Sequence, residues 1–383
     1  MTTDSFFLAG RTSVLRIAAC FLALSTPLAI AQQDETPGAK PGWTATGPLV
    51  IAREDHKATL LADGRVLVIG GSAWETSFNA GWQAGPYSSA EIYEPDTGTW
   101  RRTASLSLAR SGSTATLLPN GRVLVAGGYN LGETSSAELY DPDTGSWRPT
   151  GSLITARAHH SATLLSNGRV LIVGGQRGPV HLQSAELYDP ATETWTSTGA
   201  TRTVSYLHAA TLLPDGKVLA IGNPGCARVA EVYDPDTGLW NATTSPPAYG
   251  CAESAALLAN GDVLVTGEGA QLFDTRTGDW SATASPALVG SKHTLTVLPD
   301  GRVLATGGRH GDASVAGVEV YDPASRSWEK TAALSRSRSS HSATRLPNGK
   351  VLVAGGFDGP CCDWRDTLNT AELFDLKPLG QQE

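Results

Sequence analysis

A pattern of four short apolar runs recurs along the chain after residue 43, and this recurrence constrains the fold more than any other feature. Its clearest copy is residues 157–195, RAHHSATLLSNGRVLIVGGQRGPVHLQSAELYDPATETW. The runs HSATLL, RVLIVGG and AELYDP and the segment opening at Trp195 predict four strands. A four-stranded sheet of this kind has two apolar faces, and stacking copies face to face around an axis buries both. The repeat therefore predicts a β-propeller.

The segments between the runs predict the turns of this unit. Asn167-Gly168 between apolar runs is typical of a two-residue type I′ hairpin, which needs positive φ at both central residues. The pair Gly174-Gly175 at the end of the second run indicates close backbone packing or a bend. Pro190 presets φ for the next turn, and Asp189 can accept a hydrogen bond from the backbone beyond it.

The chain carries seven copies of this unit. The Asn/Asp-Gly pair occurs at Asp63, Asn120, Asn167, Asp215, Asn260, Asp300 and Asn348. The third run ends in an aromatic residue each time, at Tyr93, Tyr140, Tyr188, Tyr233, Phe273, Tyr321 and Phe374. A tryptophan follows the first six of these, at Trp100, Trp147, Trp195, Trp240, Trp280 and Trp328.

The seventh aromatic residue has no tryptophan after it, whereas Trp43 near the other end is unmatched. The segment GWTATGPL around Trp43 resembles SWRPTGSL after the second copy. We therefore expect the N-terminal strand to complete the last sheet, which joins the two chain ends and leaves no exposed edge strand. The predicted fold is all-β: a seven-bladed propeller of four-stranded blades, closed by strands from both termini.

The glycine pair, the Tyr-Asp-Pro and the tryptophan at this spacing resemble the kelch repeat, whose period is about 50 residues. The resemblance covers residues 43–376. Another propeller repeat carries Gly-His and Trp-Asp signatures, which these units lack. Kelch resemblance implies a fold and does not imply one activity.

The N-terminal segment predicts export. Arg11 and Arg16 precede an apolar run from Ile17 to Ile30 that is too short to span a membrane, and Ala29-Ile30-Ala31 fits a signal-peptidase site. Ile17-Ala18-Ala19-Cys20 superficially matches a lipoprotein box, but the apolar run lies after the cysteine, which favours a cleaved signal. We expect a signal peptide at 1–31, a solvated lead-in at 32–42, the propeller at 43–376 and a C-terminal tail at 377–383, with a periplasmic or secreted location.

Composition narrows the partners and the chemistry of the cysteines. The net charge of −8 and the lack of a basic stripe argue against nucleic acid. Export leaves four cysteines in an oxidising compartment, which favours disulfides. Cys226 and Cys251 belong to neighbouring blades on one face, so a Cys226–Cys251 bond is expected, whereas Cys361 and Cys362 pair with each other or stay reduced. A metal site is the alternative, but no ligand spacing supports one.

The loops predict which face binds. Strand direction alternates, so the loops from second to third strands share a face with the connections between blades, and these loops vary strongly. The longest, SAWETSFNAGWQAGPYSS in blade one and FDGPCCDWRDTLNT in blade seven, belong to neighbouring blades and should meet. They hold the three tryptophans that the repeat does not use, Trp74, Trp82 and Trp364. These side chains form either a small core for the loops or a platform for a sugar ring or a protein partner.

A second candidate lies around the axis. The first strands place a histidine at one register in five blades, with Ser113 and Glu253 in the other two: His56, His160, His208, His293 and His341. An arginine stands three residues earlier at Arg53, Arg110, Arg157 and Arg338. Either these side chains bond neighbouring blades, or they form a partly cationic funnel for an anionic ligand. Arg177, His181, Arg309 and His310 on second-to-third loops would extend that funnel.

Two classes of function remain. One is an exported, monomeric scaffold that binds a protein or a glycan, without cofactor, metal or catalytic residues. The other is an enzyme, for which galactose oxidase is the kelch comparison, with copper held by two tyrosines and two histidines and a tyrosine crosslinked to cysteine. In galactose oxidase a tyrosine ligand and a histidine ligand are adjacent, whereas here a leucine separates the nearest such pair, in Tyr206-Leu207-His208. The first cysteine after the signal is Cys226, so the early blades have no cysteine that could crosslink a tyrosine. A cofactor-free sugar epimerase or mutarotase would need an acid and a base, for which Glu253 is the candidate. The sequence favours the scaffold.

Overall fold

The computed structural model describes residues 42–75, 83–202, 209–222, 229–244, 252–267, 269–359 and 367–376, with the backbone alone for 74–75, 83–84 and 252–253. The chain divides into two units, 1–38 and 39–383, and all the described residues belong to the second. Within these ranges the chain forms strands and turns, and no helix is long and apolar enough to cross a membrane.

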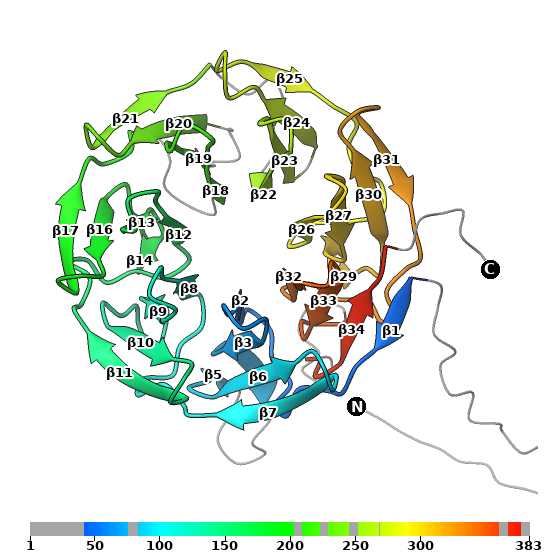
Figure 1. Ribbon diagram of the computed structural model, residues 1–383, viewed down its shortest axis with the longest axis horizontal. Coiled ribbons are helices and arrows are strands. Elements are labelled where there is room, and N and C mark those ends of the chain that lie inside the picture. Colours follow the sequence, from blue (N-terminus) through cyan, green and yellow to red (C-terminus); the bar gives the residue numbers. More distant parts are fainter. Residues whose placement is uncertain are drawn as a thin grey trace, which may run out of the picture. The chain divides into compact units, whose positions relative to one another are not determined.

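Seven four-stranded antiparallel sheets form the blades of a ring (Figure 1). Blades 1 to 3 are β2(Lys57–Leu60)–β3(Val66–Ile69)–β6(Ala90–Glu94)–β7(Thr99–Thr103), β8(Thr114–Leu117)–β9(Val123–Ala126)–β10(Ala137–Asp141)–β11(Ser146–Thr150) and β12(Ser161–Leu164)–β13(Val170–Val173)–β16(Ala185–Asp189)–β17(Thr194–Thr198). Blades 4 and 5 are β18(Ala209–Leu212)–β19(Val218–Gly222)–β20(Val229–Asp234)–β21(Leu239–Ala242) and β22(Ala252–Leu257)–β23(Val263–Gly267)–β24(Ala270–Phe273)–β25(Trp280–Ala282). Blades 6 and 7 are β26(Thr294–Val297)–β27(Val303–Thr306)–β30(Val318–Asp322)–β31(Ser327–Lys330) and β32(Ser342–Arg345)–β33(Val351–Ala354)–β34(Ala371–Phe374)–β1(Trp43–Ala45).

The ring closes as the sequence predicted. β1 pairs with β34 in antiparallel register, with Trp43 opposite Phe374. The innermost strand of each blade contacts those of both neighbours, so that β2 touches β8 on one side and β32 on the other. The seven-bladed architecture and its closure by the N-terminal strand are therefore confirmed.

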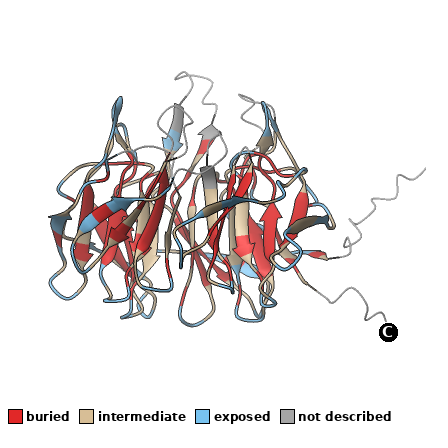
Figure 2. Cartoon of the chain, turned by 90° about the horizontal axis from the view of Figure 1, so that it is seen from above, coloured by how far each residue is buried: buried red, intermediate tan, exposed pale blue. Residues whose placement is uncertain are grey.

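The apolar core lies between the blades. The described residues contain seven apolar clusters, one at each seam between neighbouring blades. At the seam of blades 2 and 3, for example, Leu124 packs with Val170 and Ile172. The second strands are buried on both faces, which explains why their sequence is a continuous apolar run and does not alternate (Figure 2).

The repeated aromatic pair links six of the seven blades, all except blade 1, to the one before it. In blade 2 the rings of Tyr140 and Trp147 are tilted, with centroids 4.9 Å apart, an arrangement that aromatic pairs prefer. Trp147 Nε1 donates to the carbonyl of Ala104 at 2.8 Å, and the Tyr140 hydroxyl bonds Thr103 Oγ1 at 2.8 Å, both on blade 1. The aromatic residues thus fasten the outer halves of the blades to one another.

The Asn/Asp-Gly turns correct one expectation. Only the glycine has positive φ, for example +90° at Gly64, and the preceding Asp63 does not. Gly64 N donates to Leu61 O, and Leu61 N donates to Arg65 O, which is a type I turn followed by a glycine bulge. The prediction of a type I′ turn was wrong, because the loop is one residue longer and Asp63 Oδ1 accepts the Arg65 N–H at 3.0 Å.

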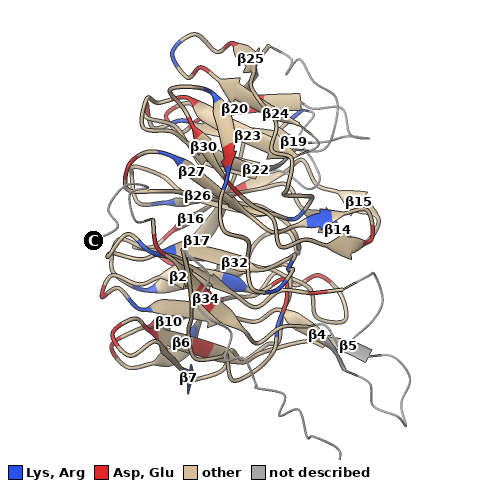
Figure 3. Cartoon of the chain, turned by 90° about the vertical axis from the view of Figure 1, so that its right-hand side faces the viewer, with Lys and Arg blue, Asp and Glu red and all other residues tan. Residues whose placement is uncertain are grey.

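In the part of the chain that the structure describes, three two-stranded ribbons extend the loops between second and third strands. They are β4(Ser72–Glu75)–β5(Gln83–Pro86) in blade 1, β14(Gln176–Arg177)–β15(Val180–His181) in blade 3 and β28(Arg309–His310)–β29(Ala313–Ser314) in blade 6. Figure 3 shows the ribbons of blades 1 and 3 projecting from the same side of the ring. We call this side, with the connections between blades, the variable-loop face and the other side the hairpin face.

Candidate functional site

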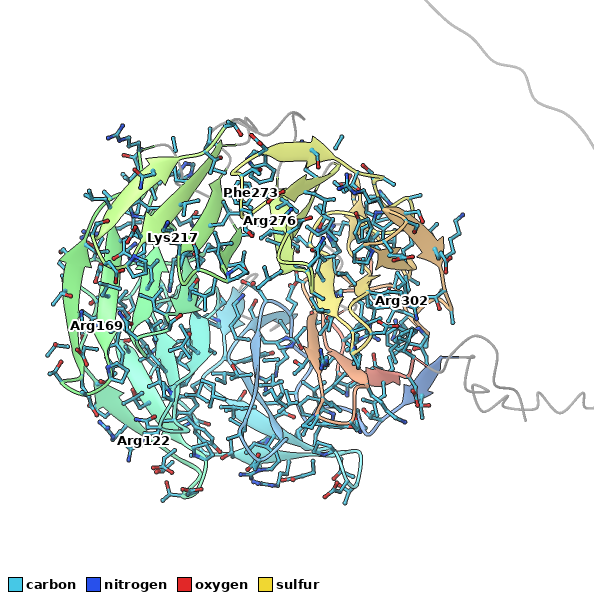
Figure 4. All side chains as sticks on the ribbon, turned by 45° about the horizontal axis from the view of Figure 1, so that its top comes forward. Arg122, Arg169, Lys217, Phe273, Arg276 and Arg302 are labelled. Carbon is cyan, nitrogen blue, oxygen red and sulfur yellow. The ribbon has the colours of Figure 1, made fainter. Side chains whose placement is uncertain are left out.

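The hairpin face is chemically uniform. Six blades carry a cation directly after the hairpin glycine, and each cation pairs with an aspartate of its own blade: Arg65, Arg122, Arg169, Lys217, Arg302 and Lys350. Figure 4 labels four of them around the ring. Exposed pairs of this kind contribute little energy and leave little net charge. The hollow between blades 1 and 2 follows the same rule, since both its arginines, Arg65 and Arg101, are in ion pairs. Blade 5 is the exception on this face, because Asp262 follows its hairpin glycine.

The recurring arginines are buried and connect neighbouring elements of the fold. All four are 0 % exposed: Arg53, Arg110, Arg157 and Arg338. Each guanidinium reaches the third strand of its own blade, where Arg157 Nη2 contacts Glu186 at 2.7 Å and Arg157 Nη1 donates to the carbonyl of Gly174 at 2.8 Å. Burial lowers the pKa of Arg157, and the charge of Glu186 opposes that shift.

The same arginine also joins its blade to the preceding one. The Arg157 carbonyl accepts the N–H of Gly128 in blade 2 at 2.8 Å, and Glu186 accepts the N–H groups of Ile154 and Thr155 in the connection. The other three arginines repeat this pattern. No part of these four side chains is open to a ligand, so their contacts support the structural interpretation and not the cationic funnel.

The described histidines of the inner register also bond neighbouring blades. His160 Nε2 lies 3.0 Å from Thr114 Oγ1, His56 Nε2 lies 2.9 Å from Ser342 Oγ, and His293 Nε2 lies 2.7 Å from Thr266 Oγ1. His341 contacts Thr294 and Thr306 in the same way. Burial is the main cause that lowers the pKa of His56 to about 3, with the Arg53 charge second, and burial also lowers the pKa of His293 and His341. The rings of His56, His293 and His341 are therefore neutral structural groups at neutral pH.

A more individual set of residues stands one position before this register. Five described residues at this position have φ between 52° and 58°: Asp55, Gly112, His159, Lys292 and Ser340. They lie at the ends of the inner strands on the variable-loop face, and neighbours are joined by hydrogen bonds from Asp55 N to Ser340 O and from His159 N to Gly112 O. Left-handed backbone is unfavourable for residues other than glycine, and such strain concentrates at functional sites. We call these five residues the mouth positions, because they lie around the axis and each is a different residue.

The ribbons of blades 3 and 6 place the outer predicted residues. Arg177 and His181 lie on β14 and β15, and both are exposed. Arg309 and His310 lie on β28, where Arg309 Nη2 donates to the Asp312 carbonyl at 2.8 Å. These residues lie on second-to-third loops of the variable-loop face, whereas the guanidinium groups of the four recurring arginines are buried.

Several predictions fall outside what the structure describes. Seven of the predicted residues lie outside the described residues: Trp82, Trp364, His208, Cys226, Cys251, Cys361 and Cys362. For Trp74 and Glu253 only the backbone is described. The proposed meeting of the two long loops and both disulfide assignments therefore stay predictions.

The sequence analysis missed two groups of residues on the variable-loop face. Large apolar side chains are exposed there, including Tyr129 and Leu131 in the loop of blade 2. The available signal was their position in a loop beside Gly132, where an apolar residue has no core to enter. The mouth positions carried a signal too, because the residue before the register histidine differs in every blade whereas its neighbours repeat.

The donor groups do not gather into a metal centre in the described ranges, where no three His, Cys, Asp or Glu side chains converge. A copper site of the galactose oxidase type needs two tyrosines and two histidines together. Here the described repeat tyrosines are buried beside tryptophans and the inner histidines bond serine and threonine hydroxyls. The described residues therefore do not fit a copper site of this type.

Comparison with known proteins agrees with the architecture. The profile of the Kelch motif matches residues 110–153, 157–199 and 292–335. A fungal alcohol oxidase of the AA5 family, solved in complex with copper, superposes with a TM-score of 0.69 at 16 % identity, over 87 % of this chain and 76 % of that one. At this identity the likeness concerns the fold alone. No curated protein sequence matches the chain.

Proposed function

Because the chain is a kelch-repeat β-propeller, a fold that does not specify an activity by itself, we propose that it is a binding scaffold. Its ligand is a protein or a glycan, held on the variable-loop face. We also propose that the chain is exported, with residues 1–31 as a cleaved signal peptide, and that it acts as a monomer. A mature N-terminus at Gln32 in the extracytoplasmic fraction would support export, and an uncleaved chain in the cytoplasm would contradict it.

One observation carries the proposal: the blades differ from each other more on the variable-loop face than on the hairpin face. On the hairpin face, six of the seven blades carry a cation after the hairpin glycine that pairs with an aspartate of its own blade. On the variable-loop face, the described residues form ribbons in three blades, and each of the five mouth positions holds a different residue. Repetition maintains a ring, and variation in a repeat scaffold maps to its binding face. The carbohydrate-active alternative rests on Glu253, whose side chain is not described, so it stays a prediction.

The test is a binding screen on the mature protein with a glycan array and a phage-displayed library of random peptides. Ligands that are found are then measured against Lys292→Ala and Arg309→Ala on the variable-loop face and Arg122→Ala and Arg302→Ala on the hairpin face. We expect affinity to fall in variants of the first face and to stay unchanged in those of the second. Losses confined to the hairpin-face variants would contradict the proposal.

A further inference from the structure

Leu131 has a conformation and an environment that folding does not explain. Its side chain is 95 % exposed, so it adds nothing to the apolar core. Its φ is +55°, in a loop closed by a hydrogen bond from Asn130 N to Gly132 O. The left-handed conformation is unfavourable for leucine, whereas glycine would adopt this backbone freely. An unfavourable residue that leaves its whole side chain in water points to a contact outside the fold.

Three further apolar side chains are exposed in the same sector. Tyr129 is 44 % exposed in the same loop, Ile154 is 60 % exposed on the connection from blade 2 to blade 3, and Val180 is 57 % exposed on the ribbon of blade 3. The three segments are joined by backbone hydrogen bonds from Leu153 N to Ser135 O and from Ala158 N to Gln176 O. Of the six exposed large apolar residues in the described ranges, four thus lie on these three hydrogen-bonded segments, and we call these four residues the blade 2–3 patch.

The charges beside this patch are mainly positive. Arg177 on β14 and Arg202 on the next connection are exposed, and no ion pair involves either guanidinium among the described side chains. Gln183 Nε2 donates to the Arg202 carbonyl at 2.7 Å, which holds Arg202 beside the base of the ribbon. Glu133 in the blade 2 loop is the one acidic residue in these segments. On the hairpin face, ion pairs within the blade hold Arg65, Arg122, Arg169, Arg276 and Arg302, so the two cations here differ from those arginines.

We infer that the blade 2–3 patch binds a protein segment whose apolar side chains are flanked by carboxylates. The inference rests on the proposed function and selects protein over glycan. Exposed leucine, isoleucine and valine offer a sugar no hydrogen bonds, whereas aliphatic and tyrosine side chains suit the centre of a protein interface. Arg177 and Arg202 at its edge match acidic residues of the partner, which favours association and sets its orientation.

The experiment pans a phage-displayed library of random peptides against the mature protein and measures the enriched peptides by calorimetry. We expect enriched sequences with Leu, Ile or Phe beside Asp or Glu. Leu131→Gly should weaken their binding by about tenfold or more and leave the melting temperature equal or higher, because glycine relieves the left-handed backbone. Val180→Ser should weaken binding similarly, and Arg177→Glu should weaken it most at low salt. Val50→Ser, at an exposed apolar site in the connection from blade 7 to blade 1, is the matched control and should have no effect.

Other outcomes overturn the inference in distinguishable ways. Peptides that lose affinity in Arg309→Ala but not in Leu131→Gly would keep a ligand on the variable-loop face and move it away from the patch. A glycan whose binding depends on Leu131 and Val180 would overturn the class of partner. A wild-type dimer that dissociates in Leu131→Gly, seen by sedimentation, would assign the patch to a second copy of the chain. Peptides insensitive to every variable-loop variant would overturn the proposed function as well.

Discussion

The buried arginines are the residues on which the ring depends most. Arg157 and Glu186 are removed from water together, and each satisfies backbone groups of a connection or a strand end as well as its partner. A buried pair contributes modest net stability, but removal of one member leaves a buried charge without compensation. These side chains therefore determine whether the inner halves of blades 2 and 3 stay aligned.

Arg157→Met is expected to lower the free energy of unfolding by about 3–5 kcal/mol, because Glu186 is left charged in the interior. Arg157→Met/Glu186→Gln should recover part of that loss, since the carboxylate charge is gone. Urea denaturation at neutral pH measures both. Arg169→Met is the control, because the exposed Arg169–Asp189 pair contributes about 0–1 kcal/mol. Equal losses for Arg157→Met and Arg169→Met would contradict this account.

The inner histidines make stability fall in acid. The pKa of His56 is about 3 in the fold and about 6.5 in an unfolded chain, so below pH 6.5 the unfolded state binds the extra proton. Its contribution is fully present above pH 6.5 and declines as pH falls towards 3, by about 2–3 kcal/mol at pH 4.5. We expect urea midpoints to drop between pH 7 and 4.5, and His56→Gln to reduce the drop. An unchanged pH slope in His56→Gln would refute the assignment.

At the scale of the element, the paired glycines are contact points between blades. A side chain at Gly127 would meet the Arg157 carbonyl at 2.6 Å and the His160 ring at 2.7 Å. The first and second strands of neighbouring blades therefore approach through a position where no Cβ fits. The glycine pair, read in the sequence as a site of close packing, has this physical cause.

Gly127→Ala is expected to lower the melting temperature by several degrees or to prevent folding, because backbone and ring must both move. Gly121→Ala is a matched control: Gly121 has φ +82° but no atom within 4 Å of the added Cβ, so it reports backbone strain alone, about 1 kcal/mol. Thermal unfolding followed by circular dichroism compares them. A larger loss for Gly121→Ala would refute the steric explanation.

The elements were predictable from the sequence to different degrees. Strand limits such as Ser161–Leu164 and the closure by Trp43 followed from periodicity, because every blade buries the same faces. The hairpin type was missed, since Asn-Gly fits both a two-residue turn and a type I turn with a bulge. The burial of Arg157 could not be deduced, because its partner Glu186 is distant in sequence and repeats as regularly as the arginine. Leu131 escaped because its backbone angle is invisible in the sequence.

At the scale of the whole molecule, the seam between blades 7 and 1 differs from the others. Trp100 Nε1 and the Tyr93 hydroxyl are buried there without hydrogen-bond partners, whereas Trp195 Nε1 donates to the Gly151 carbonyl at 2.7 Å at the seam of blades 2 and 3. Thr46 Oγ1 bonds the Gly47 carbonyl at 2.9 Å, the group that corresponds to Gly151. The closing strand thus adds edge pairing but fewer side-chain hydrogen bonds to its neighbour.

A circular permutant tests how far closure depends on the natural ends. Gly42 and Asp375 are joined by a hydrogen bond of 2.9 Å, so a short linker can connect residues 42 and 376. With new ends between the exposed Gly311 and Asp312, we expect a folded ring whose melting temperature is equal to or above that of the mature protein, because β1 can no longer detach. Thermal unfolding measures it, with deletion of residues 1–47 as the contrast expected to aggregate through the bared edge of β34. A permutant that fails to fold would show that blade 6 must be made of contiguous strands.

The pairing of Trp43 with Phe374 also imposes an order on folding during synthesis. The first strand of the ring to be synthesised stays unpaired until the last strand of the ring has been made. The ring therefore cannot close on a nascent chain that lacks β34. Premature release of the growing polypeptide would leave two strand edges unpaired at once, and both could pair with other chains.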